Sequence, residues 1–137
     1  MKLTDIDRYF REILPIALWQ ESDFGLNGLQ VGRENQNVER VAFAVDACME
    51  VFQRAAQWKG DLVFVHHGIF WGKTAPVTGY LYRRIRFLTV NDIGLYAAHL
   101  PLDVHPELGN NASLVRLLGL SDVEPFGFFR GKTVGYK

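Results

Sequence analysis

Apolar residues recur at two different spacings along the chain, and these predict alternating helices and strands. Four segments carry apolar residues at helical spacing: 3–14, 49–58, 80–90 and 111–118. Three short, continuous apolar runs are typical of strands that are covered on both faces: 41–45, 62–65 and 95–98. A further short strand is expected at 29–32. The order from residue 41 onward favours right-handed βαβ units, and therefore an α/β fold with a mostly parallel (mixed) sheet and helices on both faces.

Local signals predict where several of these elements begin and end. Thr4 is expected to cap the first helix, and Pro15 is expected to stop it. Gly60 and Gly119 are expected to close two later helices. No repeat, linker or low-complexity segment interrupts the pattern. Residues 1–137 are therefore expected to form a single α/β domain.

Composition and charge add no element to the predicted fold, but they exclude several kinds of partner and site. Fifteen basic and fifteen acidic residues cancel, so nothing points to nucleic acid or an anionic membrane as a partner. No apolar segment approaches the ~20 residues needed to span a bilayer, and acidic residues stand where a signal peptide would be apolar. The single cysteine, Cys48, excludes an internal disulfide and a cysteine-based zinc site. A cytoplasmic protein is expected.

Two of the predicted strands end in histidine. His66 and His67 follow the strand at 62–65, whereas His99 follows the strand at 95–98 and precedes Asp103 by four residues. Ligand sites of parallel sheets lie beyond the carboxyl ends of the strands, where Asp46 is also expected. Imidazoles and a carboxylate are suitable ligands for a divalent metal ion. The simpler alternative is that these are surface histidines beside a turn. A second strand that also ends in a histidine, His99, makes this alternative less favoured.

The adjacent histidines raise a geometric question. Neighbouring residues on a strand point to opposite faces, so His66 and His67 cannot both bind one ion if the strand continues through them. Either the chain turns at His67, which Gly68 permits, or the two imidazoles serve two ions about 3.5–4 Å apart. His105 is expected in a loop before a helix. Asn27 is expected to form a turn, with the orientation of a ligand as its other role.

Four motifs, taken in chain order, resemble one known family. They are Asn27–Gly32, Val65–Phe70, Ala98–Asp103 and Leu108–Asn111. Together they resemble the NIF-three-like (YbgI-like) family, whose bacterial members are often named GTP cyclohydrolase I type 2 homologues. The resemblance covers essentially the whole chain, and it implies the first lobe of the NIF-three-like fold.

The resemblance also implies a set of metal ligands. His66 and His67 match the paired metal ligands of the family, and Asp103 matches its carboxylate ligand. His99 matches a histidine that lines the same site. The implied cofactors are divalent metal cations (zinc, iron or manganese), up to two in a complete site. The implied assembly is a toroidal homohexamer.

The chain departs from the family pattern at its end. Family members are longer, and they complete their ligand set with a His-x-x-x-Glu segment near the C-terminus. Here no histidine follows His105, and the later glutamates, Glu107 and Glu124, do not complete that segment. The chain is therefore expected to be the N-terminal portion of a longer two-lobed protein. Its own ligands are too few to hold two ions without water or a partner chain.

Two classes of function remain open. The first is a metal-dependent hydrolase that acts on a small nucleotide-like molecule, with the ions as Lewis acids. The second is a non-catalytic, metal-stabilised oligomeric binding or scaffold protein, or a fragment that lacks a complete site. A homo-oligomer is expected in either case. The candidates for its interface are Phe126, Phe128 and Phe129 near the end of the chain, with Phe70 and Trp71 around the site, although packing within the core is an equal alternative for each.

Overall fold

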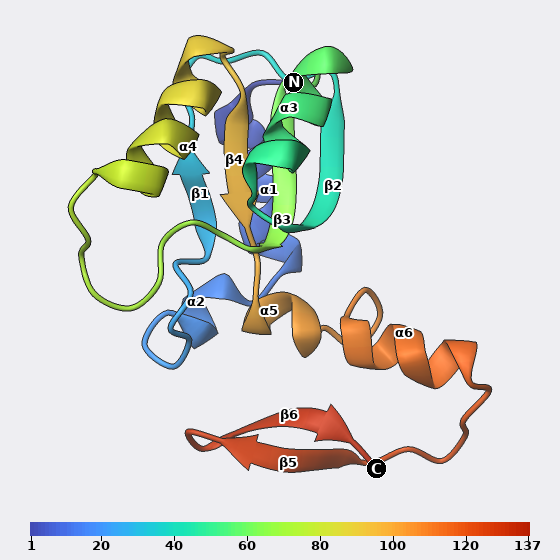
Figure 1. The fold of residues 1–137 in the computed structure, drawn as a ribbon. Coiled ribbons are helices and arrows are strands. Elements are labelled where there is room, and N and C mark those ends of the chain that lie inside the picture. The colour runs from blue at the N-terminus through green and yellow to red at the C-terminus, as the bar shows by residue number, and fades with distance from the viewer.

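The computed structural model covers residues 1–137 and contains six helices and six strands (Figure 1). The helices are α1 (Leu3–Ile13), α2 (Ile16–Trp19), α3 (Met49–Gln57), α4 (Gly79–Val90), α5 (Leu100–Asp103) and α6 (Asn110–Leu117). The strands are β1 (Gly28–Val31), β2 (Val41–Asp46), β3 (Leu62–His67), β4 (Gly94–Ala97), β5 (Pro125–Phe129) and β6 (Lys132–Tyr136). None of the helices combines the length and the apolar character needed to cross a membrane.

Four of the strands form one mixed sheet, in the order β1-β4-β3-β2. Strands β2, β3 and β4 run parallel, whereas β1 pairs antiparallel with β4. The expected α/β fold with a mostly parallel, mixed sheet is confirmed. In the register of β2 and β3, Asp46 lies opposite His67, so the carboxyl ends of these strands meet at one edge.

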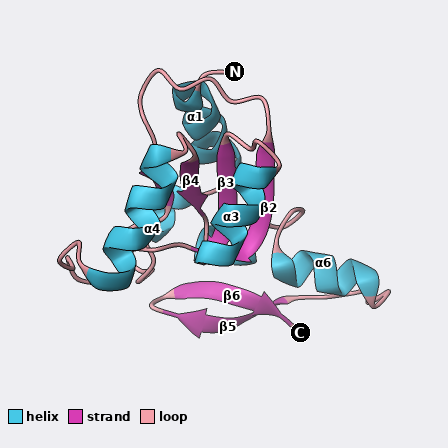
Figure 2. Cartoon of the chain, turned by 45° about the horizontal axis from the view of Figure 1, so that its top comes forward, coloured by secondary structure: helices cyan, strands magenta, loops and turns pink.

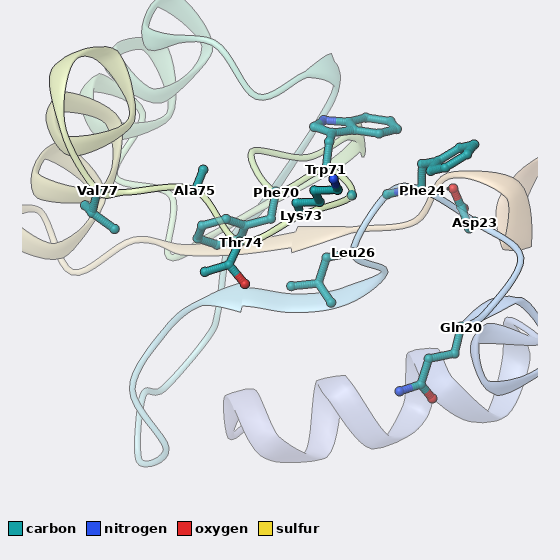
Figure 3. Close-up of a pocket in the computed structure, with 12 residues that line it drawn as sticks. Gln20, Asp23, Phe24, Leu26, Phe70, Trp71, Lys73, Thr74, Ala75 and Val77 are labelled. Carbon is teal, nitrogen blue, oxygen red and sulfur yellow. Dashed lines mark hydrogen bonds between the residues drawn. The ribbon is translucent and has the colours of Figure 1, made fainter.

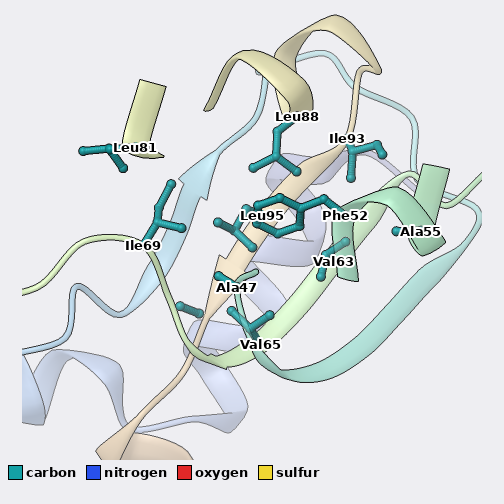
Figure 4. Close-up of a cluster of buried hydrophobic side chains, with 11 residues drawn as sticks. Ala47, Phe52, Ala55, Val63, Val65, Ile69, Leu81, Leu88, Ile93 and Leu95 are labelled. Carbon is teal, nitrogen blue, oxygen red and sulfur yellow. The ribbon is translucent and has the colours of Figure 1, made fainter. Parts of the chain in front are cut away.

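Helices cover both faces of this sheet, as predicted. Helices α3 and α4 pack on one face, where the buried cluster in Figure 4 includes Phe52, Val63, Leu88 and Leu95. Helix α1 packs on the other face with Tyr96 and other buried residues. Burial of this much apolar surface is the main force that holds the strands in register.

Strand β2 differs from its prediction. It was expected to be covered on both faces, but the side chains of Phe43 and Val45 are 71% and 62% exposed. Strand β2 is an edge strand, and it contributes no fully buried side chain to the α1-side cluster, whereas β3 and β4 do. Continuous apolar sequence therefore does not imply burial on both faces at the edge of a sheet.

Two expected helix ends are also corrected. Helix α1 begins earlier than a Thr4 cap would allow, because the backbone N–H of Leu3 already donates to the carbonyl of Gln36 at 2.9 Å. At the end of α3, Lys59 rather than Gly60 takes the left-handed conformation, with φ 59°. Gly60 follows it and donates its N–H to the carbonyl of Ala55. Both ends are satisfied by backbone groups that the sequence pattern does not reveal.

The C-terminal part lies beside the sheet domain rather than in it (Figure 2). Strands β5 and β6 form an antiparallel hairpin, which the sequence pattern did not predict. Phe126, Phe128 and Phe129 are 57%, 83% and 36% exposed, so core packing does not account for the first two. Arg130 and Lys132 attach the hairpin to the loop before β1, through a carbonyl of Glu21 and the hydroxyl of Ser22.

Candidate metal centre

Three histidines meet beyond the carboxyl ends of β3 and β4. The ring centroids of His66 and His67 lie 4.6 Å apart, and those of His66 and His99 lie 4.9 Å apart. One ring nitrogen from each histidine lies within 4.8 Å of the others. Asp103 adjoins the group, with its Oδ2 atom 3.6 Å from Nε2 of His66. The four residues expected at this edge are therefore brought together.

His66 and His67 converge although β3 continues through both of them. The ladder between β2 and β3 still pairs Asp46 with His67, so the chain turns only afterwards. The turn at His67 is therefore not the solution, and the two rings nevertheless lie with their centroids 4.6 Å apart. These are the last two residues of the strand, and their rings extend past the end of the sheet, where no further strand residues separate its two faces.

Each of the three histidines directs its Nδ1 atom at a fixed acceptor. Nδ1–H of His66 donates to the carbonyl of Ala98 at 3.1 Å. Nδ1–H of His67 donates to Oδ1 of Asp46 at 2.7 Å. His99 uses Asp23 in the same way, at 2.9 Å. Carbonyl and carboxylate oxygens cannot donate, so the hydrogen bonds place a proton on Nδ1 of all three rings, and each neutral ring is then the Nδ1–H tautomer. The lone pair of each Nε2 atom is then free to bind a cation.

Asp103 adds a carboxylate to the cluster. Nε2 of His66 and Oδ2 of Asp103 lie 3.6 Å apart, and in the neutral Nδ1–H form of His66 this nitrogen is an acceptor. Burial lowers the pKa of His66 below its ordinary value, despite the opposing effect of Asp103, so the charged imidazolium is disfavoured. Oδ1 of Asp103 accepts a hydrogen bond from Asn110, which fixes the carboxylate in place.

Asp23 organises the loop that leads into β1. Its side chain is 1% exposed, and its two oxygens accept four hydrogen bonds: from Nδ1 of His99, from Nδ2 of Asn27 and from the backbone N–H groups of Gly25 and Leu100. Burial alone would raise the pKa of Asp23, but the hydrogen bonds outweigh it and lower the pKa. Sequence reasoning missed this residue, because an aspartate in a turn-rich loop is ordinary turn chemistry.

Two amide side chains of the same region hold the surrounding backbone. Oδ1 of Asn27 accepts a hydrogen bond from the backbone N–H of His99 at 2.7 Å. Asn27 therefore orients the backbone at His99, just after β4, as well as its own turn. Gln30 bridges two loops, because it accepts the N–H of Ile69 and donates to the carbonyl of Leu26. A Cβ atom on Gly68 would overlap the amide of Gln30. Gly68 is therefore needed for the close approach of these loops.

Trp71 covers one side of the histidine cluster. Its ring lies 5.0 Å from the ring of His99, edge to face, and its Nε1–H donates to the carbonyl of Gly68. A β-bridge pairs Trp71 with Gly25, where a Cβ atom would lie 3.2 Å from the indole. The missing side chain of Gly25 thus makes room for the indole beside His99.

His105 lies outside the cluster, as expected from the sequence. Its Nδ1 atom accepts the backbone N–H groups of Glu107 and Leu108, in the turn between α5 and α6. Its ring therefore serves the local turn.

Comparison with known proteins now decides the family. The family model described as Duf34/NIF3 (NGG1p interacting factor 3) matches residues 1–135. The chain belongs to the DUF34/NIF3 family. A DUF34/NIF3 relative from Treponema pallidum, named GTP cyclohydrolase 1 type 2 homolog, is 49% identical over 98% of this chain and 47% of its own length. A relative of the same name from Pyrococcus abyssi is 44% identical over 99% of this chain and 53% of its own length.

A solved structure supports the same placement. The crystal structure of TTHA1606 from Thermus thermophilus superposes with a TM-score of 0.85 at 45% identity, over 92% of this chain and 51% of that one. The predicted resemblance to the NIF-three-like family is therefore confirmed, both for the sequence and for the fold. The chain spans about half the length of the DUF34/NIF3 relatives that it matches.

Proposed function

We propose that His66, His67, His99 and Asp103 hold a divalent metal ion, and that this site serves the hydrolysis of a small nucleotide-like substrate. The observation that carries the proposal is the convergence of one ring nitrogen from each of the three histidines within 4.8 Å, with Oδ2 of Asp103 3.6 Å from Nε2 of His66. Neutral imidazoles and a carboxylate that meet in this way are stabilised by a cation between them. The names of the relatives support the nucleotide part of the proposal.

The donor set fits such an ion. Imidazole nitrogen and carboxylate oxygen are ligands of zinc, iron and manganese, and each histidine already has the hydrogen bond on Nδ1 that accompanies metal ligation by Nε2. The offered nitrogens lie within 4.8 Å of one another. Small side-chain rotations would bring them to the ~3.3 Å separation of nitrogen ligands around a tetrahedral zinc ion. Three nitrogens and one carboxylate suit one ion, and a second ion would need further donors.

The residues around the site would share the remaining work. A bound divalent ion would supply Lewis-acid chemistry, by polarising a substrate oxygen and lowering the pKa of water. Asp23 and Asp46 would orient His99 and His67 through their Nδ1 hydrogen bonds. Asp103 would offset part of the positive charge. Trp71 would exclude water from one side of His99.

A metal titration tests the site directly. We expect zinc or manganese to bind the metal-free protein at one equivalent in calorimetry. Loss of a ligand in His66→Ala or Asp103→Ala should weaken that binding by at least about tenfold. His105→Ala is the control, because this histidine serves only a turn, and its affinity should equal that of the wild type. Equal affinity in all four proteins would contradict the metal site.

The hydrolytic part needs a separate assay. GTP consumption with and without the bound metal should show metal-dependent turnover that Asp103→Ala abolishes. We expect turnover to be lower than that of a relative about twice as long, because this chain offers only one carboxylate, Asp103, to the ion. Stoichiometric metal binding without any turnover in either protein would reject the hydrolase and keep the metal site.

One observation favours the second class of function, an oligomeric binding protein. Phe126 and Phe128 are exposed on the hairpin, and Leu117 on α6 is 83% exposed. Large exposed apolar side chains mark interfaces. A homo-oligomer therefore belongs to the proposal, and the family resemblance implies a hexamer as its form. Sedimentation at several concentrations tests it, and a monomer throughout would overturn it. The cytoplasmic location stays a prediction.

A further inference from the structure

A cavity of about 480 Å³ opens beside the histidine cluster. It lies between the loop that carries Asp23 and the loop that follows β3. The two loops are joined by backbone hydrogen bonds, from Leu26 to the carbonyl of Phe70 at 3.0 Å and from Gly72 to the carbonyl of Phe24 at 2.6 Å. The volume is in the range of small-molecule sites. This cavity is thus held between two segments that also position the candidate metal ligands.

The cavity shares a wall with the candidate metal centre. Asp23 and Trp71 line it, and both also contact His99, through a hydrogen bond and through the edge of the indole. Figure 3 shows the rings of Trp71 and Phe24 grouped with Asp23 at one end of the cavity, and Val77 at the other end. A ligand that lay against Trp71 would therefore also lie next to the histidines.

The charges in the cavity favour an anionic group. Lys73 is its only basic lining residue, and it forms no ion pair. Asp23 is its only acidic lining residue, but the side chain is 1% exposed and its oxygens are occupied by four hydrogen bonds. Thr74, the next residue along the chain, adds a hydroxyl group to the lining. Lys73 thus offers the cavity an ammonium group without an ion-pair partner, and the guanidinium of Arg130 adds a second positive charge over the ring of Phe24.

The rest of the lining favours a planar ring. Phe24, Phe70 and Trp71 contribute aromatic side chains, and Leu26 contributes an aliphatic one. Phe24 and Leu26 are more than half exposed, and the guanidinium of Arg130 lies 4.4 Å from the centre of the Phe24 ring. Aromatic side chains bind heterocyclic rings by stacking and leave the polar edge of the ring accessible.

We propose that this cavity binds a phosphorylated aromatic heterocycle, with the ring at the Trp71 and Phe24 end and the phosphate at Lys73 and Thr74. The inference rests on the proposed function, since it places the substrate of that site. The inference goes beyond the proposed function, because it assigns substrate recognition to residues that do not bind the metal. A ring held against Trp71 would lie beside His99.

Binding to the metal-free protein tests this inference apart from catalysis. The probes are GTP, guanosine and tripolyphosphate, titrated by calorimetry. Lys73→Met should weaken GTP and tripolyphosphate by about tenfold and leave guanosine unchanged. Trp71→Leu should weaken GTP and guanosine by roughly fivefold or more and leave tripolyphosphate unchanged. The matched controls are Lys59→Met and Trp58→Leu, exposed residues outside the cavity, which should bind like the wild type.

The outcomes separate the two proposals. Binding of GTP that depends on both Lys73 and Trp71 supports the inference, even if the metal-loaded protein shows no turnover, a result that would reject only the hydrolase. Failure of the wild type to bind any probe would overturn the inference, as would equal affinities in the cavity variants and the controls. Zinc affinity of Trp71→Leu equal to that of the wild type would show that the variant is folded and that its defect concerns the ring.

Discussion

Replacement of Asp23 by asparagine should separate the structural role of this carboxylate from its role beside the metal. Each oxygen of Asp23 accepts two hydrogen bonds: Oδ1 from Gly25 and His99, and Oδ2 from Asn27 and Leu100. In Asp23→Asn an NH₂ group takes the place of one oxygen. Whichever oxygen it replaces, two donors then face a donor, and two of the four hydrogen bonds are lost.

The expected cost follows from the burial of this side chain. A hydrogen bond to a charged group contributes about 1.5–3 kcal/mol, so two of them amount to about 3–6 kcal/mol. The loop around Asp23 can relax, and we therefore expect about 3 kcal/mol, the lower end of that range. This is a large part of the ~5–15 kcal/mol that stabilises a domain. The change is well within the reach of urea unfolding monitored by circular dichroism.

Asp46→Asn is the matched control. Asp46 makes the same kind of bond, to Nδ1 of His67, but its side chain is 67% exposed. Its loss should cost less than about 0.5 kcal/mol. Both variants should weaken zinc binding by about 10–100-fold, because both histidines lose the acceptor that orients them. Equal shifts of the urea midpoint in the two variants would refute the assignment of Asp23 as a buried structural centre.

Three further predictions concern stability. The lowered pKa of Asp23 implies stability that is complete above its unfolded pKa of 3.8 and is lost as the pH falls through the lower folded value. Acid titration of the urea midpoint should therefore show a smaller loss in Asp23→Asn than in the wild type, because the exposed Asp92–Arg33 pair contributes to both. Gly68→Ala should cost about 1–3 kcal/mol in urea unfolding by displacing the Gln30 amide, and it should cost little in a Gln30→Ala background. Lys59→Gly should add about 0.5 kcal/mol in thermal unfolding, because φ at this position is 59°, whereas Lys59→Ala should add nothing.

The long elements of this fold could be predicted because each buries a periodic apolar face. The helices at 49–57 and 79–90 and the strands at 62–67 and 94–97 appear within about two residues of their expected positions. The histidine edge could be predicted for a related reason. Once β3 and β4 are parallel neighbours, their carboxyl ends must lie together, and the residues that follow them meet.

The remaining features depend on contacts that no local pattern encodes. Asp23 meets His99 across 76 residues, and nothing near Asp23 in the sequence announces that partner. The short helices α2 and α5 are single turns, too brief to show a period. The exposure of Phe43 depends on the position of β2 at the edge of the sheet, which follows from the strand order rather than from β2 itself.

The wide sequence separation within the candidate metal centre has a consequence for folding. His99 and Asp23 are 76 residues apart, His66 and the carbonyl of Ala98 are 32 apart, and His67 and Asp46 are 21 apart. An unfolded chain does not hold these groups together, so an ion would bind almost exclusively to the native state. Metal at a hundred times its dissociation constant would then raise the unfolding free energy by about 2.7 kcal/mol. Because the site is completed only after distant segments have joined, that gain should appear as slower unfolding rather than as faster folding.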